Sequence, residues 1–269
     1  MARFLSSKPL AAALAALLLL VAVPAFAAEA LVQPVPVPDL SRLPADKAKA
    51  LRDARIDFEK MKPTLVGDKL AGAYALLGSF YAQGGFYPEA AVALEDAAAL
   101  APNDARWIYA QGILARIQNQ NPAAQQYFEK AFAIDQHYLP MRMALVNIRI
   151  EQGDLDGAKK LLTDYTAGNP SDAVSYAMLG EIDLKQKRYA EAVEATNKAL
   201  ANDPQATKLY AQLADAYTGA GNAKAASEAR AKVGQGAPSL GDPIMLGLLQ
   251  TQVTPPAPAQ SQAADKNEA

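Results

Sequence analysis

The chain has 269 residues, and its 26 Lys and Arg residues nearly balance its 28 Asp and Glu residues, giving a net charge of −2 at pH 7. Nucleic acids and anionic lipids are bound by clustered Lys and Arg, so this balance favours neither partner. The chain has no Cys and only one His, which excludes disulfides and thiolate metal sites, and we expect no metal and no other cofactor.

Residues 1–27 have the layout of a secretory signal peptide. Arg3 and Lys8 precede an uncharged apolar run, and small residues ending at Ala27 follow it. The apolar run is shorter than the roughly 20 residues that a membrane-spanning helix needs. We therefore expect cleavage near Ala27 and export to the periplasm, with a net charge of −4 after the loss of these two basic residues. The alternative is that the uncharged stretch 9–28 stays uncleaved as a membrane anchor.

Residues 28–43 are rich in proline and predict an extended linker. The apolar residues that come next recur at helical spacing among charged ones: Leu51, Ala54, Phe58 and Met61. Pro63 then stops the pattern. We interpret this stretch as an amphipathic helix that begins the folded unit 44–238 and caps its N-terminal end.

A period of 34 residues follows, with repeats at 71–104, 105–138, 139–172, 173–206 and 207–240. Proline occupies position 32 of every repeat except the second, where Gln136 stands: Pro102, Pro170, Pro204 and Pro238. Alanine occupies position 20 throughout: Ala90, Ala124, Ala158, Ala192 and Ala226. Because several columns share one register, we expect five similar structural units.

The columns are typical of two antiparallel helices in each repeat. Leucine at position 7 and an aromatic residue at position 4 share one face of the first helix. Small residues at positions 8 and 20 allow the two helices to approach closely. Glycines at position 15 provide the turn between them, as at Gly85, Gly153 and Gly221. Proline at position 32 ends the second helix, because it lacks a backbone donor.

These columns resemble the tetratricopeptide repeat family, and the first repeat matches best: Tyr74, Leu77, Gly78, Tyr81, Tyr87, Ala90, Leu94, Ala97 and Pro102. The resemblance implies an all-α fold, a right-handed superhelical solenoid of five hairpins whose first helices line a concave groove. Four residues depart from the pattern: Arg142, Tyr165, Thr196 and Arg230. We expect the hairpins that carry them to pack less tightly.

Asp242 and Pro243 are typical of the N-cap and the first residue of a helix. Residues 241–250 are therefore expected to form a short capping helix that closes the C-terminal end of the solenoid, and residues 251–269 a disordered polar tail. Residue patterns of catalytic sites are sparse. We interpret His137 as an exposed turn residue and expect no enzymatic activity.

The resemblance places positions 2, 5, 9, 12 and 13 of each first helix on the concave side. In repeat 1 these residues are small or neutral: Gly72, Ala75, Ser79, Ala82 and Gln83. The later repeats supply our candidate groove residues: Arg106, Tyr109, Ile113, Arg116, Met143, Asn147, Glu181 and Lys185. Tyr, Met and Arg are favoured at interfaces, since they combine contact area with hydrogen bonding. The alternative is that Tyr109 and Ile113 only pack on neighbouring helices.

The order of charges, with Arg106 and Arg116 early and Glu181 late, predicts a groove that is basic at one end and acidic at the other. These features favour a periplasmic scaffold or adaptor that binds a peptide or protein partner, itself exported or membrane-bound. The resemblance implies assistance to the assembly of envelope or respiratory machinery. The alternative is a structural solenoid that associates with itself and has no dedicated ligand. We expect no nucleic acid or metal partner, and membrane contact only if the N-terminal segment is retained.

Overall fold

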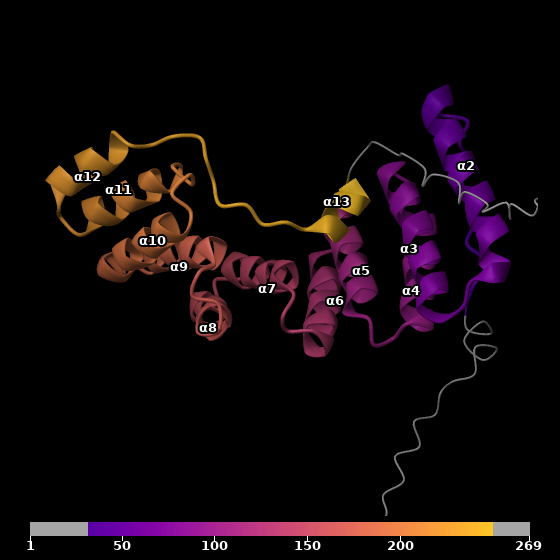
Figure 1. Ribbon diagram of the computed structural model, residues 1–269, viewed down its shortest axis with the longest axis horizontal. Helices are drawn as coiled ribbons and strands as arrows, with labels where there is room; N and C mark the ends of the chain where they lie inside the picture. The colour runs from indigo at the N-terminus through magenta and orange to yellow at the C-terminus, as the bar shows by residue number, and fades with distance from the viewer. Residues whose placement is uncertain (1–31, 250–269) are drawn as a thin grey trace, which may run out of the picture.

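The computed structural model describes residues 32–249, and every regular element in that range is helical. The expected signal peptide, the alternative anchor and the expected C-terminal tail lie outside the described residues. The elements are α2 (Ala45–Met61), the 3₁₀ turn η1 (Lys62–Thr64), α3 (Gly67–Gln83), α4 (Tyr87–Leu100), α5 (Ala105–Ile117), α6 (Asn121–Ile134), α7 (Leu139–Glu151), α8 (Leu155–Thr166), α9 (Ala173–Lys185), α10 (Tyr189–Asn202), α11 (Leu209–Gly219), α12 (Ala223–Arg230) and α13 (Pro243–Leu249). Ten of these helices, α3 to α12, form five consecutive hairpins, one in each expected repeat (Figure 1).

The turns inside the hairpins share one backbone conformation at position 15. Gly85, Gly153 and Gly221 have φ angles of 82°, 80° and 76°. At the same position of the second and fourth repeats, Asn119 and Lys187 adopt φ angles of 60° and 59°. Left-handed backbone is costly for a residue with a Cβ atom, so its recurrence at one position indicates that the two-helix geometry requires it.

The two small-residue columns meet between the helices of each hairpin. The alanines of position 20 are all buried, with exposed fractions of 0 or 1%. A Cβ atom added to Gly112, at position 8, would lie 2.3 Å from a ring carbon of Phe128. The second helix of the hairpin therefore lies too close for any larger residue at this point.

The looser packing that we expected is observed in part: α7 and α8 are in less extensive contact than the helices of the other hairpins, whereas α9 and α10 pack closely around Thr196. Arg142 and Thr196 are both buried. The Thr196 hydroxyl donates to the carbonyl oxygen of Ala192 at 2.7 Å and accepts from Gln212 Nε2 at 2.9 Å. Buried polar groups cost little when they have partners, as the Thr196 hydroxyl and the two terminal nitrogens of Arg142 do, whereas the Arg142 Nε is buried without one.

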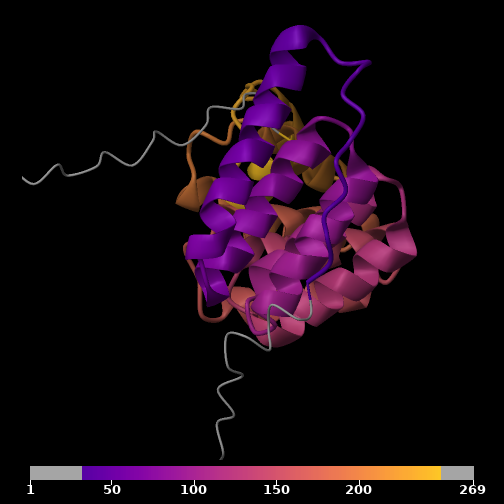
Figure 2. The same ribbon diagram turned by 90° about the vertical axis from the view of Figure 1, so that its right-hand side faces the viewer.

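The extended segment before α2 packs on the first hairpin instead of standing free (Figure 2). Val35 is buried, and its carbonyl oxygen accepts from Arg55 of α2 at 2.9 Å. The backbone N–H of Gln33 donates to Asp96 Oδ1 on α4 at 2.8 Å. The expected linker thus covers the outer face of the first repeat together with α2.

Asp96 gives this contact a pH dependence. Its other carboxylate oxygen is buried without a hydrogen-bond partner, and burial raises the pKa of Asp96 to about 6, although the Gln33 N–H and the charge of Lys62 act in the opposite direction. A carboxyl group with a raised pKa in the folded state costs stability wherever it is ionised, so this cost grows as the pH rises from about 4 to about 6.

Asp96→Asn is therefore expected to raise the free energy of unfolding at pH 7.5, by on the order of 1–3 kcal/mol. The advantage of the variant over the native chain should shrink by about 2 kcal/mol at pH 4.5, where the folded native carboxyl is protonated. Urea denaturation of both chains at the two pH values measures this difference. The contributions of all other titrating groups cancel, because the two chains share them. An advantage that does not change with pH would contradict the assignment.

The position of α13 corrects one expectation. The helix forms where Asp242 and Pro243 predict it, but it does not cap the C-terminal end of the solenoid. It packs against α3 and α5, the first helices of the first two repeats (Figure 1). The chain after α12 turns back along the molecule to reach them. The apolar side chains of α13 are too few to cover the C-terminal end of the solenoid. They are buried more deeply where the helix contacts α3 and α5.

No helix within residues 32–249 combines the length and the apolar character needed to cross a membrane.

Candidate functional site

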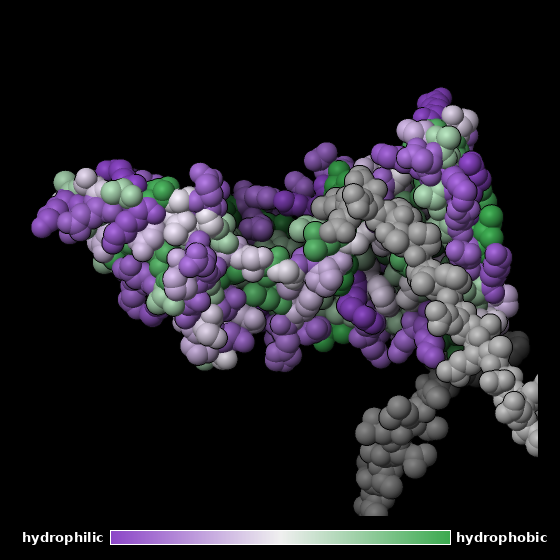
Figure 3. Space-filling model, turned by 45° about the horizontal axis from the view of Figure 1, so that its top comes forward, coloured by the Kyte–Doolittle hydropathy of each residue, from purple (hydrophilic) through white to green (hydrophobic). Residues whose placement is uncertain are grey.

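The concave side of the solenoid is hollowed and partly filled by α13. Figure 3 shows largely apolar surface in the hollow, with hydrophilic residues along its edges. Leu248 of α13 is only 2% exposed and belongs to the same buried cluster as residues of α2 to α7. Ile244, one helical turn earlier, is half-buried against that cluster. These two side chains fix the inward face of α13.

The small residues of repeat 1 provide the space that α13 occupies. Gly72, Ala75 and Ser79 of α3 line a cavity of about 370 Å³ together with Ile244 and Leu248 of α13. Gln83, at the end of α3, donates through Nε2 to the carbonyl oxygen of Gly247. What reads in the sequence as a featureless groove is therefore a seat for a helix, because larger side chains there would fill the space.

Asp242 is held by a polar clamp at the start of α13. The carboxylate is only 3% exposed. Its Oδ2 accepts from the Tyr109 hydroxyl at 2.6 Å, and its Oδ1 accepts from the Tyr138 hydroxyl at 3.1 Å. The backbone N–H of Met245 also donates to Oδ1, at 3.0 Å, which caps the helix. Three donors thus compensate the buried carboxylate.

The two tyrosines remain donors throughout the ordinary pH range. Burial, and then the contact with Asp242, raise the pKa of Tyr109 well above its usual value. The same causes raise the pKa of Tyr138. A carboxylate at this buried position accepts from both neutral hydroxyls, whereas the ammonium group of a Lys would be buried without an opposite charge.

Two glycines direct the chain from α12 back toward the clamp. The backbone N–H of Lys208 donates to the carbonyl oxygen of Gly236 at 2.7 Å, and the N–H of Gly234 donates to that of Thr207 at 3.2 Å. A Cβ atom on Gly236 would lie 1.8 Å from the carbonyl oxygen of Gln205. Only glycine allows the two backbones to approach this closely.

Five of the residues expected in the groove line one cavity there. Tyr109, Ile113, Arg116, Met143 and Asn147 border a space of about 240 Å³, and Asp242 and Met245 are also in its lining. Asn147 is exposed, whereas Tyr109, Ile113 and Met143 are 3 to 6% exposed. Tyr109 also packs on Phe128, with ring centroids 5.4 Å apart. Tyr109 therefore combines the packing role that we left open with a contact to the segment in the groove.

The two groove arginines are paired with acidic residues of the solenoid itself. The two terminal guanidinium nitrogens of Arg116 donate to Glu151, at 2.8 and 2.9 Å. Arg106 is paired in the same way with Asp104, the residue that caps α5, and lies over the ring of Trp107. The expected basic end of the groove is therefore largely neutralised, because each positive charge already has a carboxylate partner.

The remaining two expected residues lie apart from α13. Glu181 and Lys185 pair with each other along α9, with 3.5 Å between the charged atoms, and each remains nearly half exposed. Neither lines the cavities around α13.

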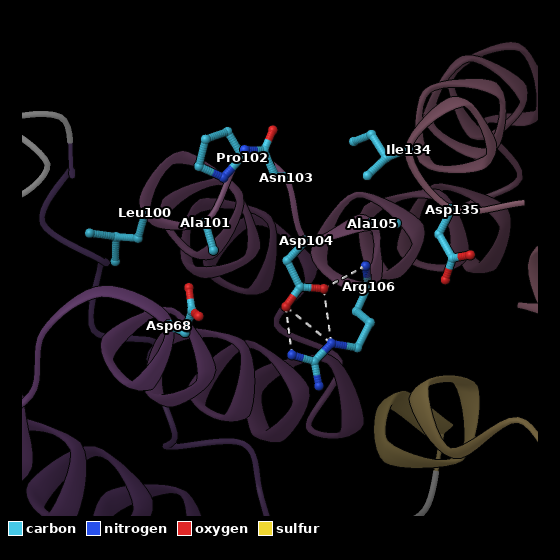
Figure 4. A pocket seen from close by; sticks show the side chains of 10 residues that line it. All are labelled: Asp68, Leu100, Ala101, Pro102, Asn103, Asp104, Ala105, Arg106, Ile134 and Asp135. Atoms are coloured by element: carbon cyan, nitrogen blue, oxygen red, sulfur yellow. Dashed lines mark hydrogen bonds and ion pairs between the residues drawn. The ribbon is translucent and has the colours of Figure 1, made fainter. Parts of the chain in front are cut away.

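A second hollow lies at the turn between the first two repeats and has a different character. It measures about 530 Å³ and is lined by Asp68, Asp104 and Asp135 around Arg106 (Figure 4). The dashed lines in Figure 4 join Arg106 to Asp104, so the only basic group in this lining is already paired. Within residues 32–249 no group of three His, Cys, Asp or Glu side chains is placed to hold a metal ion. The chemistry available around α13 is hydrogen bonding and apolar contact.

The sequence did not single out Tyr138, nor did it assign Asp242 and Leu248 to the groove. Tyr138 precedes the first helix of repeat 3, and Asp242 reads as a simple N-cap. The only available signal was the unusual run of small residues at the groove positions of repeat 1, which indicates space for something large. That signal does not say which segment fills it.

The stacked hairpins define a helical-repeat solenoid, and comparisons with known proteins agree. Two family models, both described as tetratricopeptide repeat, match residues 115–182 and 173–206. A comparison with curated proteins found no match. Residues 115–206 of the chain thus match tetratricopeptide repeats.

Several solved structures have the same fold. MamA from Desulfovibrio magneticus RS-1 is 23% identical over 61% of this chain and 92% of its own, with a TM-score of 0.54. YrrB, described as a TPR protein with an unusual peptide-binding site, is 17% identical over 65% and 90%, with a TM-score of 0.54. Pseudomonas aeruginosa PilF is 22% identical over 61% and 74%, with a TM-score of 0.52. At these identities the similarity establishes the fold alone.

Proposed function

We propose that this protein is a periplasmic interaction scaffold, not an enzyme, and that its concave groove binds a peptide segment of an exported or membrane protein. One observation carries the proposal: the groove already holds a polypeptide helix, bound through side chains of two different repeats. A surface that seats a helix through apolar anchors and a polar clamp has what peptide recognition requires. The peptide-binding site described for YrrB is consistent with this use of the fold.

The periplasmic location rests on the sequence of residues 1–27. Mass spectrometry of the mature chain from a fractionated envelope is expected to find an N-terminus near Ala28 in the periplasmic fraction. A retained Met1 in the membrane fraction would support the uncleaved anchor instead. The more specific role, assistance to the assembly of envelope or respiratory machinery, rests on the family resemblance and follows from the partner identified below.

A photo-crosslinking amino acid at Asn147 tests the groove in living cells. Asn147 is exposed and borders the cavity beside α13. The matched control is Lys160 on α8, also exposed, with 76% of its side chain accessible. We expect the Asn147 probe to yield one discrete adduct with another envelope protein, and the Lys160 probe to yield none of it.

Three results would count against the scaffold. Equal adducts from both positions would mean that the groove is not the binding surface. No adduct above background at either position would mean that no partner is bound there. Adducts only with a second copy, together with a dimer mass by light scattering, would favour the self-associating structural solenoid.

A further inference from the structure

We infer that α13 is a displaceable resident ligand of the groove, and that the partner which replaces it carries a short apolar helix beginning with a carboxylate residue. The inference rests on the proposed function, because it names the ligand class of the same groove. The geometry of α13 supplies both parts of it, the displacement and the chemistry.

α13 is held by contacts to distant parts of the chain. It has seven residues, and a helix this short is not stable alone in water. The clamp joins residues that are 133 and 104 positions apart, and the bond from Gln83 to Gly247 spans 164 positions. Residues 231–242, which lead to α13, contain no helix or strand. A short helix on a long non-helical tether can leave its seat without unfolding any repeat.

The seat is incompletely filled while α13 occupies it. Cavities of about 370 and 240 Å³ remain on the lining shared with α13. The indole Nε1 of Trp107, which borders the larger cavity, is buried and has no hydrogen-bond partner. Met245, which borders the smaller cavity, and Leu246 are 40% and 46% exposed. A longer or bulkier helix that fills these spaces would bury more apolar surface and could supply the missing acceptor.

The contacts of α13 specify the chemistry of its replacement. A carboxylate must face Tyr109 and Tyr138, since both hydroxyls donate there. Apolar side chains must follow at the second and sixth positions after it, where Ile244 and Leu248 stand. The small residues of α3 do not restrict the size of the side chains at these two positions, because a Cβ atom added to Gly72 would meet no atom within 4 Å. The partner is thus an apolar helix that begins with an acidic residue, and not a basic peptide.

Release of α13 is tested in the full chain with a fluorescein-labelled synthetic peptide that has the sequence of residues 239–249. Leu248→Asp places a charge in the buried anchor and should free the groove. Leu246→Asp makes the same chemical change at an exposed position of the same helix and is the matched control. By fluorescence anisotropy, Leu248→Asp is expected to bind the peptide about tenfold or more tightly than the native chain, since the apparent affinity scales with the fraction of open groove. Leu246→Asp should bind it as the native chain does.

The polar clamp is tested with a second peptide that carries Lys at the position of Asp242. We expect this peptide to bind Leu248→Asp at least about tenfold more weakly, because the ammonium group cannot accept from the two tyrosines. Equal affinity for the two peptides, or equal affinity of the two Leu→Asp variants for the first peptide, would overturn the inference.

A reversible lock makes the test independent of any folding defect in Leu248→Asp. The chain contains no Cys, Gln83 contacts Gly247, and a Cβ atom on Gly247 would meet no atom within 4 Å. A direct disulfide needs Cβ atoms about 3.8 Å apart, so the double variant Gln83→Cys, Gly247→Cys is joined with a bis-maleimide whose linker contains a cleavable disulfide, which fastens α13 in the groove. Peptide binding is expected to disappear on crosslinking and to return when the linker is cleaved by reduction. Unchanged binding by the locked protein would refute displacement.

The two proposals can fail separately. If the peptide experiments succeed but the Asn147 probe finds no envelope partner, the ligand chemistry stands and the proposed cellular function falls. If the Asn147 probe captures a partner whose binding is unaffected by the lock, the scaffold stands and α13 is not displaced by that partner.

Discussion

Replacing Arg142 with alanine is expected to lower the free energy of unfolding by roughly 3–5 kcal/mol. The guanidinium of this buried residue lies between the rings of Phe132 and Tyr165, 4.9 and 5.0 Å from their centroids. It donates to the carbonyl oxygens of Leu161 and Gln136, at 2.8 Å each. Alanine would leave a cavity between the two rings and remove both donors, so each consequence adds to the loss.

Arg149→Ala is the matched control for this prediction. Arg149 lies on the same helix, α7, and forms an exposed ion pair with Asp154, with 41% and 45% of the two side chains accessible. Exposed ion pairs contribute about 0–1 kcal/mol, so the control should unfold almost like the native chain. Urea denaturation followed by circular dichroism measures both variants. A loss at Arg142 no larger than the loss at Arg149 would show that the sandwich does not stabilise the fold.

Gly236→Ala is expected to lower the free energy of unfolding by about 1–3 kcal/mol, because the new methyl group would collide with the Gln205 carbonyl. Backbone atoms cannot turn aside as a side chain does, so the segment after α12 must move and the bond from the Lys208 N–H to the Gly236 carbonyl is strained or lost. The backbone N–H of Met245 donates to the Asp242 carboxylate, which caps α13. Its hydrogen exchange is expected to become faster, because the displaced segment holds α13 less firmly.

Gly241→Ala makes the same change five residues later in the same segment. A Cβ atom there would meet no atom within 4 Å, so the control should be neutral or slightly stabilising through the reduced freedom of its unfolded chain. Differential scanning calorimetry of both variants, with hydrogen exchange read by mass spectrometry, tests the pair. Equal melting temperatures would mean that the close backbone approach does not hold the returning segment.

The repeat architecture could be predicted because its signals are local and recur. Alanine stands at position 20 of every hairpin and a small residue at position 8 of all but the third, which has Val146, since the distance between the two helices is set there. The left-handed turn at position 15 is visible where it is glycine and hidden where Asn119 and Lys187 adopt it. At the column that Arg142 occupies the sequence did not show how the side chain is accommodated, because its partners, Phe132 and Tyr165, come from other helices.

The candidate site could be predicted only in part. Position numbers within the repeat indicated Tyr109, Arg116 and Asn147, and all three border one cavity. Their partners were not predictable. Arg116 pairs with Glu151 of the next repeat, and that contact depends on the rotation between repeats. Residue types at groove positions predict a surface, whereas its charge depends on which neighbours neutralise it.

α13 separates what the sequence determined from what the tertiary structure decided. Asp242 and Pro243 determined that a helix begins at this point, because capping involves only residues within one turn. Its seat was decided by bonds to Tyr109 and Gln83, more than a hundred residues away in the chain. Such contacts leave no period and no motif in the sequence, because they depend on how five hairpins curve and on where two glycines turn the chain back.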